Sequence, residues 1–324
     1  MQFSLKLDIP ELSPAITYRN SFLLIGSCFT EHISERLQQY KFKVCSNPHG
    51  ILFNPLSVSD SLNRYVSGKE YEEDDLFYLN ELWNSWEHHT QFSDIDKNTT
   101  LNTINTSLKE ATEAVRKADY IMITLGSAFQ YFLTASQKSV SNNHRAPGQW
   151  FEKRLLETEV IKDRLQHSME SVLTVNRQAK FIFTISPVRH IRDGIIANNR
   201  SKARLLEAVH ELCETNENSY YFPAYELVVD VLRDYRFYDI DFVHPNYMAT
   251  QFVWEQFVKS CVSAETQSTM QRVREIALAM KHRPRFPETQ AHRQFRADSL
   301  EKTERLLLEY PFLDLQEERT FFKT

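Results

Sequence analysis

Two short segments at opposite ends of the sequence contain residue types that can carry out acyl transfer. Gly26, Ser27 and Cys28 follow a short apolar run and precede a helical pattern, so two candidate nucleophiles lie at a strand-to-helix turn. Asp241 and His244 precede another helical pattern. At this spacing the carboxylate can hold the imidazole in one tautomer while the other ring nitrogen faces a nucleophile. Together the segments predict a covalent acyl intermediate.

Either Ser27 or Cys28 could be the nucleophile. A thiol at Cys28 would lie at the N-terminus of the following helix, where unsatisfied amides and the partial positive charge favour a thiolate. His244 would then be the general base and acid, and Asp241 would orient it. Structural interpretations compete with these roles: Cys28 as a small buried residue, Ser27 as a turn residue that bonds local backbone, and Asp241 as a helix cap beside a surface histidine.

Apolar runs alternate with amphipathic stretches through about the first 260 residues, which predicts a parallel sheet covered by helices on both faces. The expected strands cover residues 22–25, 42–45, 120–125, 181–185 and 220–222. The expected helices cover residues 31–40 with Thr30 as N-cap, 101–117, 149–175, 201–213 and 246–261. Because ligands bind at the carboxyl ends of parallel strands, the loops after these strands are the candidate site.

Four of these loops combine a small turn residue with polar side chains. The first contains the Ser27 and Cys28 turn, and the others are residues 47–55, 126–131 and 186–190. The candidate substrate-binding residues in these loops and in the segment 141–147 are Gly50, Asn54, Gly126, Asn143, His144, Arg189 and His190. A buried ion pair with Asp193 is the competing interpretation of the last two.

An aromatic and imidazole cluster, Trp83, Trp86, His88 and His89, could cover a substrate. Adjacent histidines without a spaced third ligand make a poor metal signature, so we expect neither a metal nor another cofactor.

The overall composition fits a globular enzyme with a small acyl substrate. The chain has 324 residues, of which 42% are hydrophobic and 25% charged, and its net charge is -5. This charge predicts no general attraction to nucleic acid or to an anionic membrane. The N-terminal segment lacks a secretory signal pattern, and the four cysteines are widely scattered, so we expect a cytoplasmic protein with reduced thiols. Nothing in the sequence indicates an oligomeric state.

Seven segments together resemble the GSCFA family. They are GSCFT at 26–30, NPHGILFNP at 47–55, LWNSWEHHTQFS at 82–93, ITLGSAFQY at 123–131, ISPVRHIRDG at 185–194, RDYRFYDIDFVHP at 233–245 and HRPRFPETQAHRQF at 282–295. The resemblance implies an SGNH or GDSL-like hydrolase domain over residues 1–262, a three-layer α/β/α sandwich with a flavodoxin-like strand order. A helical C-terminal extension would follow over residues 263–324.

The same resemblance assigns roles to individual positions. The serine nucleophile of the GDSL turn falls on Cys28, and Ser27 takes the place of the aspartate, so the resemblance favours Cys28 over Ser27 as the nucleophile. The GxND block would fall on residues 126–129, so Ala128 stands where an asparagine donates to the oxyanion. The backbone amides of Cys28 and Gly50 could replace that donor, as could Asn54 or Asn143.

These observations leave more than one function open. We expect an esterase or acyl hydrolase that acts on a small acyl ester or thioester. An acyltransferase to a hydroxyl or amine acceptor would use the same residues. A non-catalytic protein that binds a small acylated or glycan ligand is a third interpretation, supported by the missing asparagine. Interaction through the locally basic C-terminal helices is a fourth.

Overall fold

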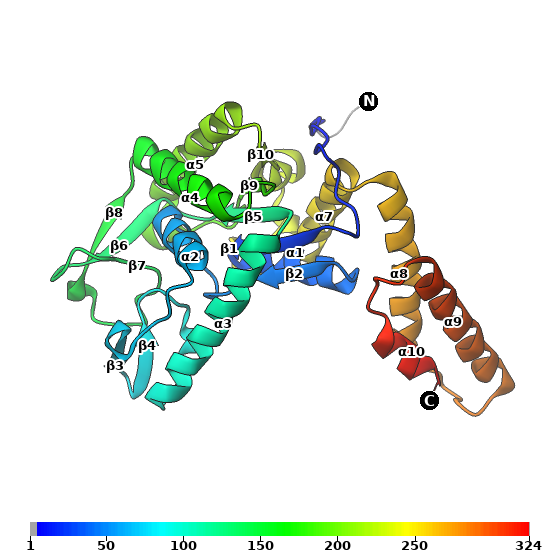
Figure 1. Cartoon of the computed structure of the whole chain (residues 1–324). Coiled ribbons are helices and arrows are strands. Elements are labelled where there is room, and N and C mark those ends of the chain that lie inside the picture. Colours follow the sequence, from blue (N-terminus) through cyan, green and yellow to red (C-terminus); the bar gives the residue numbers. More distant parts are fainter. Residues whose placement is uncertain (1–4, 324) are drawn as a thin grey trace.

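The central sheet of the computed structural model, which describes residues 5–323, is parallel and has five strands (Figure 1). The strands are β1 (Ser21–Gly26), β2 (Lys43–Ser46), β5 (Tyr120–Leu125), β9 (Lys180–Ile185) and β10 (Ser219–Tyr221). Their order across the sheet is β10-β9-β5-β1-β2, which is the flavodoxin-like order 2-1-3-4-5. All five strands expected from the apolar runs are confirmed to within one residue at each end.

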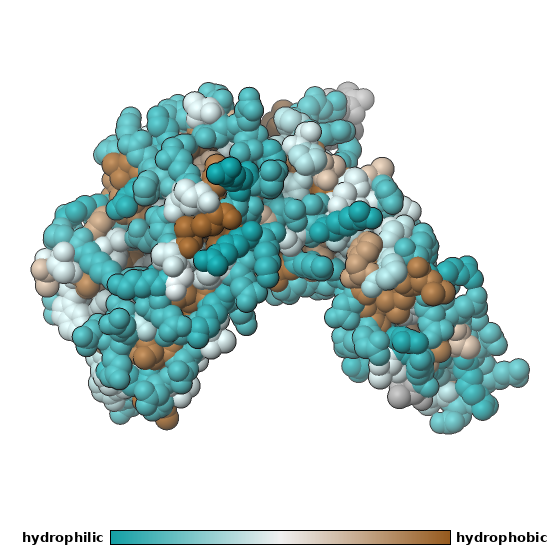
Figure 2. Space-filling model, in the orientation of Figure 1, coloured by the Kyte–Doolittle hydropathy of each residue, from teal (hydrophilic) through white to brown (hydrophobic). Residues whose placement is uncertain are grey.

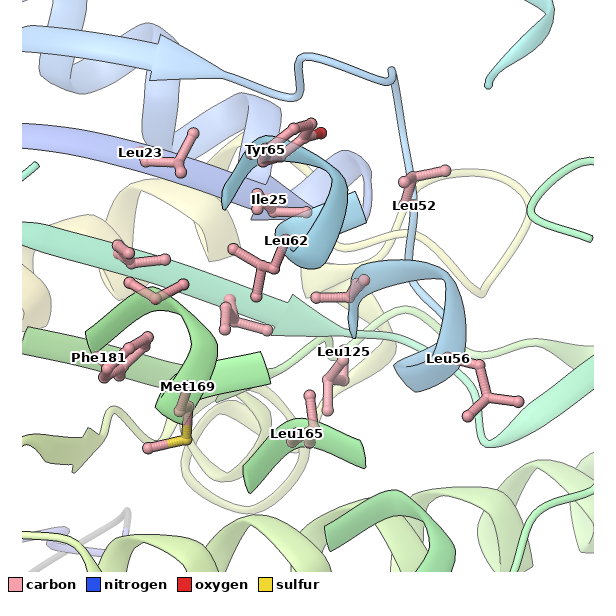
Figure 3. Close-up of a cluster of buried hydrophobic side chains, with 14 of the residues drawn as sticks. Leu23, Ile25, Leu52, Leu56, Leu62, Tyr65, Leu125, Leu165, Met169 and Phe181 are labelled. Atoms are coloured by element: carbon pink, nitrogen blue, oxygen red, sulfur yellow. The ribbon is translucent and has the colours of Figure 1, made fainter. Parts of the chain in front are cut away.

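Helices cover both faces of this sheet and bury alternate side chains of each strand. Leu23 and Ile25 of β1 pack into one hydrophobic cluster with α2, α3, α4 and α5, and Figure 3 shows part of it. Phe22 and Leu24 point to the opposite face, into a second cluster with α1 and α7. The helices are α1 (Cys28–Gln39), α2 (Pro55–Ser67), α3 (Lys97–Lys117), α4 (Thr158–Val175), α5 (Ile195–Thr215), the short α6 (Ala224–Glu226) and α7 (Tyr247–Cys261).

Two small antiparallel sheets extend from the α/β layers. One is the hairpin of β3 (Leu76–Leu79) and β4 (Leu82–Ser85), and the other has the order β7-β6-β8. The strands of the second are β6 (Phe129–Leu133), β7 (Ser139–Val140) and β8 (Phe151–Leu155). The expected helix over 149–175 is therefore wrong in its first part, because residues 151–155 pair with β6 as a strand, in which half-buried and exposed residues alternate.

The C-terminal extension is helical and shares a hydrophobic core with the sheet domain. Figure 1 shows its three helices beside that domain. Met270, Val273 and Ile276 of the first helix are buried in the cluster that also contains residues of α1 and α7. Lys41 and Glu318 form an ion pair with an N–O distance of 2.6 Å between the last helix and the turn after α1. The helices are α8 (Ala264–Lys281), α9 (Gln290–Glu309) and α10 (Gln316–Lys323).

On the face drawn in Figure 2 the surface is mainly polar, and apolar side chains form separate patches. Over residues 5–323, none of the helices combines the length and apolar character that crossing a bilayer requires.

Candidate functional site

The turn between β1 and α1 is held in a shape that only glycine allows. The Gly26 N–H donates to Asn47 Oδ1 at 2.9 Å, which ties the turn to the loop after β2. A Cβ atom on Gly26 would lie 2.4 Å from Thr30 Oγ1 and 2.5 Å from the Thr124 carbonyl oxygen. Because the Thr124 contact is with backbone, no side-chain rotation would relieve it. The close approach of Thr124 of β5 to Gly26 therefore requires glycine at the turn that leads into α1.

Ser27 is the N-cap of α1. Its side chain is 2% exposed, and its Oγ accepts a hydrogen bond from Phe29 N–H at 3.3 Å. Thr30 lies inside the helix, where its N–H donates to the Ser27 carbonyl at 2.8 Å. The expectation that Thr30 caps a helix starting at Glu31 is wrong, because the chain enters the helix directly at Cys28. The cap occupies the Ser27 hydroxyl with backbone.

We expect Ser27→Ala to lower the free energy of unfolding by about 1 kcal/mol, since the substitution leaves a helix N–H without its side-chain acceptor. Urea denaturation measures this loss. The rate at which iodoacetamide alkylates Cys28 should change little in the same variant, because the sulfur keeps its place. Unchanged stability would contradict the capping role.

Cys28 is the first residue of α1, and its thiol is half-buried. Burial and the nearby Glu31 carboxylate raise its pKa, while the N–H groups of Phe29 and Cys28 and the Lys202 amine act in the opposite direction. The helix amides thus lie at the sulfur as expected, but burial outweighs them. The thiol is therefore protonated near neutral pH and needs a base, contrary to the expectation of a favoured thiolate.

Asp241 and His244 form a connected pair in the loop before α7. Asp241 Oδ2 lies 2.6 Å from His244 Nδ1, and Oδ1 accepts the N–H groups of Val243 and His244, each at 3.0 Å. These bonds lower the pKa of Asp241 to about 2, so the carboxylate is ionised at any ordinary pH. The carboxylate fixes Nδ1 of the ring, which leaves Nε2 for a reacting group.

Cys28 and His244 lie where two clefts meet. The sheet-edge cleft, of about 580 Å³, is lined by the loops after β1, β2, β5 and β9 and by residues of the small β7-β6-β8 sheet and its loops. The helix cleft, of about 500 Å³, is lined mainly by α1 and the start of α7, and Lys281 at the end of α8 closes it. Val188 also lines both clefts. Among the bonds of residues 5–323, no hydrogen bond joins the Cys28 sulfur to the His244 imidazole. Catalytic hydrogen bonds often tighten only when a substrate binds.

Four of the seven residues expected to bind substrate line the sheet-edge cleft: Asn54, Asn143, Arg189 and His190. Gly126 frames the same cleft, since a Cβ there would lie 3.1 Å from His190 Nε2. The Asn54 amide donates to the Phe129 carbonyl, so this part of its hydrogen-bonding capacity is already used.

Gly50 and His144 lie outside the residues that line either cleft. The Gly50 N–H donates to the Asn47 carbonyl at 2.7 Å within a turn, so it is not free for an oxyanion. The His144 Nε2 lies 2.8 Å from the Ser85 carbonyl oxygen, and the ring packs edge-on against Trp86. Both expectations fail because the 47–50 turn and the 141–145 loop use these groups to hold the chain together.

His190 presents a neutral imidazole to the sheet-edge cleft. Its ring stacks on Phe53 with centroids 4.9 Å apart, and its buried Nε2 has no hydrogen-bond partner among the described residues. Burial, reinforced by the Lys202 charge, lowers the pKa of His190 to about 4. The competing interpretation of an ion pair with Asp193 is wrong, because Asp193 pairs with Lys153. A substrate oxygen or N–H is the kind of group that could satisfy His190 Nε2.

The position of the missing asparagine is closed to substrate. Ala128 is fully buried, and its N–H donates to Ser201 Oγ at 2.7 Å. The N–H groups of Cys28 and Phe29 lie at the Cys28 sulfur. The Asn143 side chain faces the same cleft, while its Oδ1 accepts from Arg145 N–H.

The aromatic and imidazole cluster is mostly structural. His88 is fully buried against His49, with ring centroids 4.1 Å apart, and burial lowers its pKa. Trp86 stacks on Phe77 with centroids 3.6 Å apart, and only His89 lines the sheet-edge cleft. Within the described chain, residues 5–323, no three His, Cys, Asp or Glu side chains are grouped so that they could hold a metal ion.

The sequence reasoning missed Lys202, a fully buried amine beside the site. A signal for it exists, because Lys202 precedes Leu205 and Val209 by three and seven residues on the apolar face of α5. A lysine in the middle of a helix's buried stripe is unusual and indicates a specific partner.

The fold and site define an α/β protein with a parallel five-stranded sheet, and with cysteine, histidine and aspartate side chains at the carboxyl edge of that sheet. Residues 21–257 match the model of the GSCFA family, and residues 273–324 match that of the GSCFA domain protein C-terminal domain. The chain therefore belongs to the GSCFA family. A search of curated proteins finds no match to it.

Proposed function

We propose that this protein is an SGNH-like hydrolase of small acyl esters or thioesters that works through an acyl group on Cys28. The observation that carries the proposal is the shared position of Cys28 and His244 at the junction of two clefts, with His244 held by Asp241. The strand order and a nucleophile turn directly after the first strand support the SGNH relationship.

The proposed reaction begins with a neutral thiol. His244 Nε2 takes the proton as Cys28 Sγ attacks the substrate carbonyl carbon, and the N–H of Cys28 donates to the developing oxyanion. The bond to the leaving group then breaks, and His244 returns the proton to that group. Water attacks the resulting thioester with His244 again as base, which releases the acid and restores the thiol. Asp241 stays ionised and stabilises the imidazolium in both halves.

The helix cleft favours acyl transfer as the second candidate function. An acyl group in the sheet-edge cleft would leave the opposite side of the thioester facing the helix cleft, where a hydroxyl or amine could approach His244. Arg36, Glu35 and Lys281 line that cleft and could bind a polar acceptor. Hydrolysis and transfer would share the first half-reaction and differ only in what attacks the thioester.

The test is intact mass and peptide mapping after brief exposure to p-nitrophenyl acetate or to acetyl-CoA. We expect an acetyl group on the peptide that spans residues 21–36. The adduct should vanish in Cys28→Ala and persist in Ser27→Ala, because the Ser27 hydroxyl is used as a helix cap.

The opposite pattern, loss in Ser27→Ala alone, would assign the chemistry to serine. A folded protein that gains no acetyl group from either donor would contradict catalysis and favour the ligand-binding interpretation. If the adduct forms, faster loss on adding glycerol or a simple amine would support transfer over hydrolysis.

A further inference from the structure

The proposed reaction does not use the most unusual charged group near the site. Lys202 is 1% exposed, and its Nζ donates to the carbonyl oxygens of Gly126 and Ser186, each at 2.6 Å. These carbonyls belong to the loops that follow β5 and β9, two neighbouring strands of the central sheet. One amine therefore ties together two loops that contribute residues to the lining of the sheet-edge cleft.

The surroundings of Lys202 contain no carboxylate that could balance its charge. Within residues 5–323 no ion pair includes Lys202. Burial, with help from Arg189, lowers the pKa of Lys202 to about 7, so the amine changes charge near neutral pH. The neutral amine has two N–H bonds, which match its two carbonyl partners. The protonated form carries a third proton and a full charge in a buried place.

The groups that face Lys202 come from several elements. They are Arg189 and His190 from the loop after β9, the Tyr225 ring 6.0 Å away, and Cys28 at the start of α1. Arg189 is a cation, and burial lowers the pKa of His190 and raises that of Tyr225, which keeps both neutral. Cys28 is therefore the neighbour at which negative charge develops, and its ionisation favours the protonated amine.

We infer that Lys202 is a positioning residue whose buried ammonium group stabilises negative charge on the Cys28 sulfur while it joins the two cleft loops. Its part in acyl transfer rests on the proposed function, whereas its effect on the thiol does not. Attraction between the two groups is screened less than it would be in water, because Lys202 is fully buried and Cys28 is half-buried. The interaction is reciprocal, so the charge on either group makes the charge on the other more favourable.

The effect of Lys202 on the Cys28 thiol depends on pH in one direction. Below about pH 7 Lys202 is protonated and lowers the pKa of Cys28, which increases the fraction of reactive thiolate. Above that pH the amine becomes neutral and this help is lost. The influence of Lys202 on Cys28 is therefore largest at acid pH and fades as pH rises.

The test is the rate constant for alkylation of Cys28 by iodoacetamide as a function of pH, read from the peptide that spans residues 21–36. In Lys202→Met we expect a rate about tenfold below wild type near pH 6 and close to wild type near pH 9. Melting temperatures of all variants are recorded at the same pH values. Alkylation needs no acyl substrate, so this result is independent of the acetylation experiment.

Ser201→Ala is the matched control. Ser201 lies on the same helix and bonds the N–H of Ala128 in the same loop, but it carries no charge. Any loosening of the loop in this variant should change the alkylation rate by one factor at every pH. If the ratio of the Lys202→Met rate to the wild-type rate were also the same at every pH, the electrostatic role would be overturned and Lys202 would be purely structural.

The wild-type profile keeps the inference testable if Lys202→Met does not fold. If Lys202 and Cys28 are coupled, the logarithm of the alkylation rate rises with pH with a slope below one between the pKa values of the two groups. An isolated thiol gives a profile with a single ionisation. A single ionisation would overturn the inference. If Cys28 is acetylated but Lys202→Met shows no pH-dependent loss of alkylation rate, only the inference about Lys202 is refuted. If Lys202→Met shows that loss but no acetyl adduct forms, only the proposed function is refuted.

Discussion

We expect His244→Ala to lower the rate of Cys28 acetylation by p-nitrophenyl acetate by about 10²- to 10⁴-fold and to leave the melting temperature nearly unchanged. The thiol has a raised pKa, so without a base little thiolate forms near neutral pH. The His244 side chain is 48% exposed, and its partner Asp241 lies on the same loop. Removing the imidazole therefore costs little packing. Stopped-flow release of p-nitrophenol measures the rate, and thermal unfolding measures the stability.

His167→Ala is the control for this prediction. His167 is exposed on α4 and faces neither cleft, so its loss should leave both quantities as in wild type. A fall in melting temperature of His244→Ala that matches the loss of rate would mean that the histidine holds the loop before α7. An unchanged rate would show that another group takes the thiol proton.

We expect Val273→Asp to destabilise the whole protein by about 3–5 kcal/mol, because it places an uncompensated carboxylate in the core that the sheet domain shares with the C-terminal helices. Val273 is 1% exposed on α8 and belongs to the cluster that contains Phe29 of α1 and Trp254 of α7. Trp254 reports on this cluster, so urea denaturation followed by tryptophan fluorescence and by circular dichroism measures the effect. We expect both signals to shift together.

Glu275→Ala is the matched control, since Glu275 is exposed two residues further along the same helix and should change stability little. If Val273→Asp unfolded the C-terminal helices while the sheet domain kept wild-type stability, the shared core would not couple the two parts. The interpretation of the extension as a separate binding module would then regain support.

The sequence by itself determined the parts of this protein that depend on local pattern. Apolar runs fix the three central strands β1, β5 and β9, because a strand buried on both faces tolerates few polar side chains. Asp241 and His244 pair as expected, because the local turn in which Val243 and His244 N–H donate to Asp241 brings these two side chains together. The turn that carries Ser27 and Cys28 is local as well, although the cap proved to be Ser27.

Only the tertiary structure decided which groups remain available for chemistry. Gly50 and His144 have the residue types of a site, but contacts with Asn47 and Ser85 use their hydrogen-bonding groups. Lys202 lies on an amphipathic helix, and the packing of α5 against the loops of two strands holds its amine at the Gly126 and Ser186 carbonyls. Hydrogen bonds and burial between distant segments cannot be read from periodicity, since they depend on how the elements pack. Those same contacts set the protonation of the thiol, of His190 and of the buried lysine.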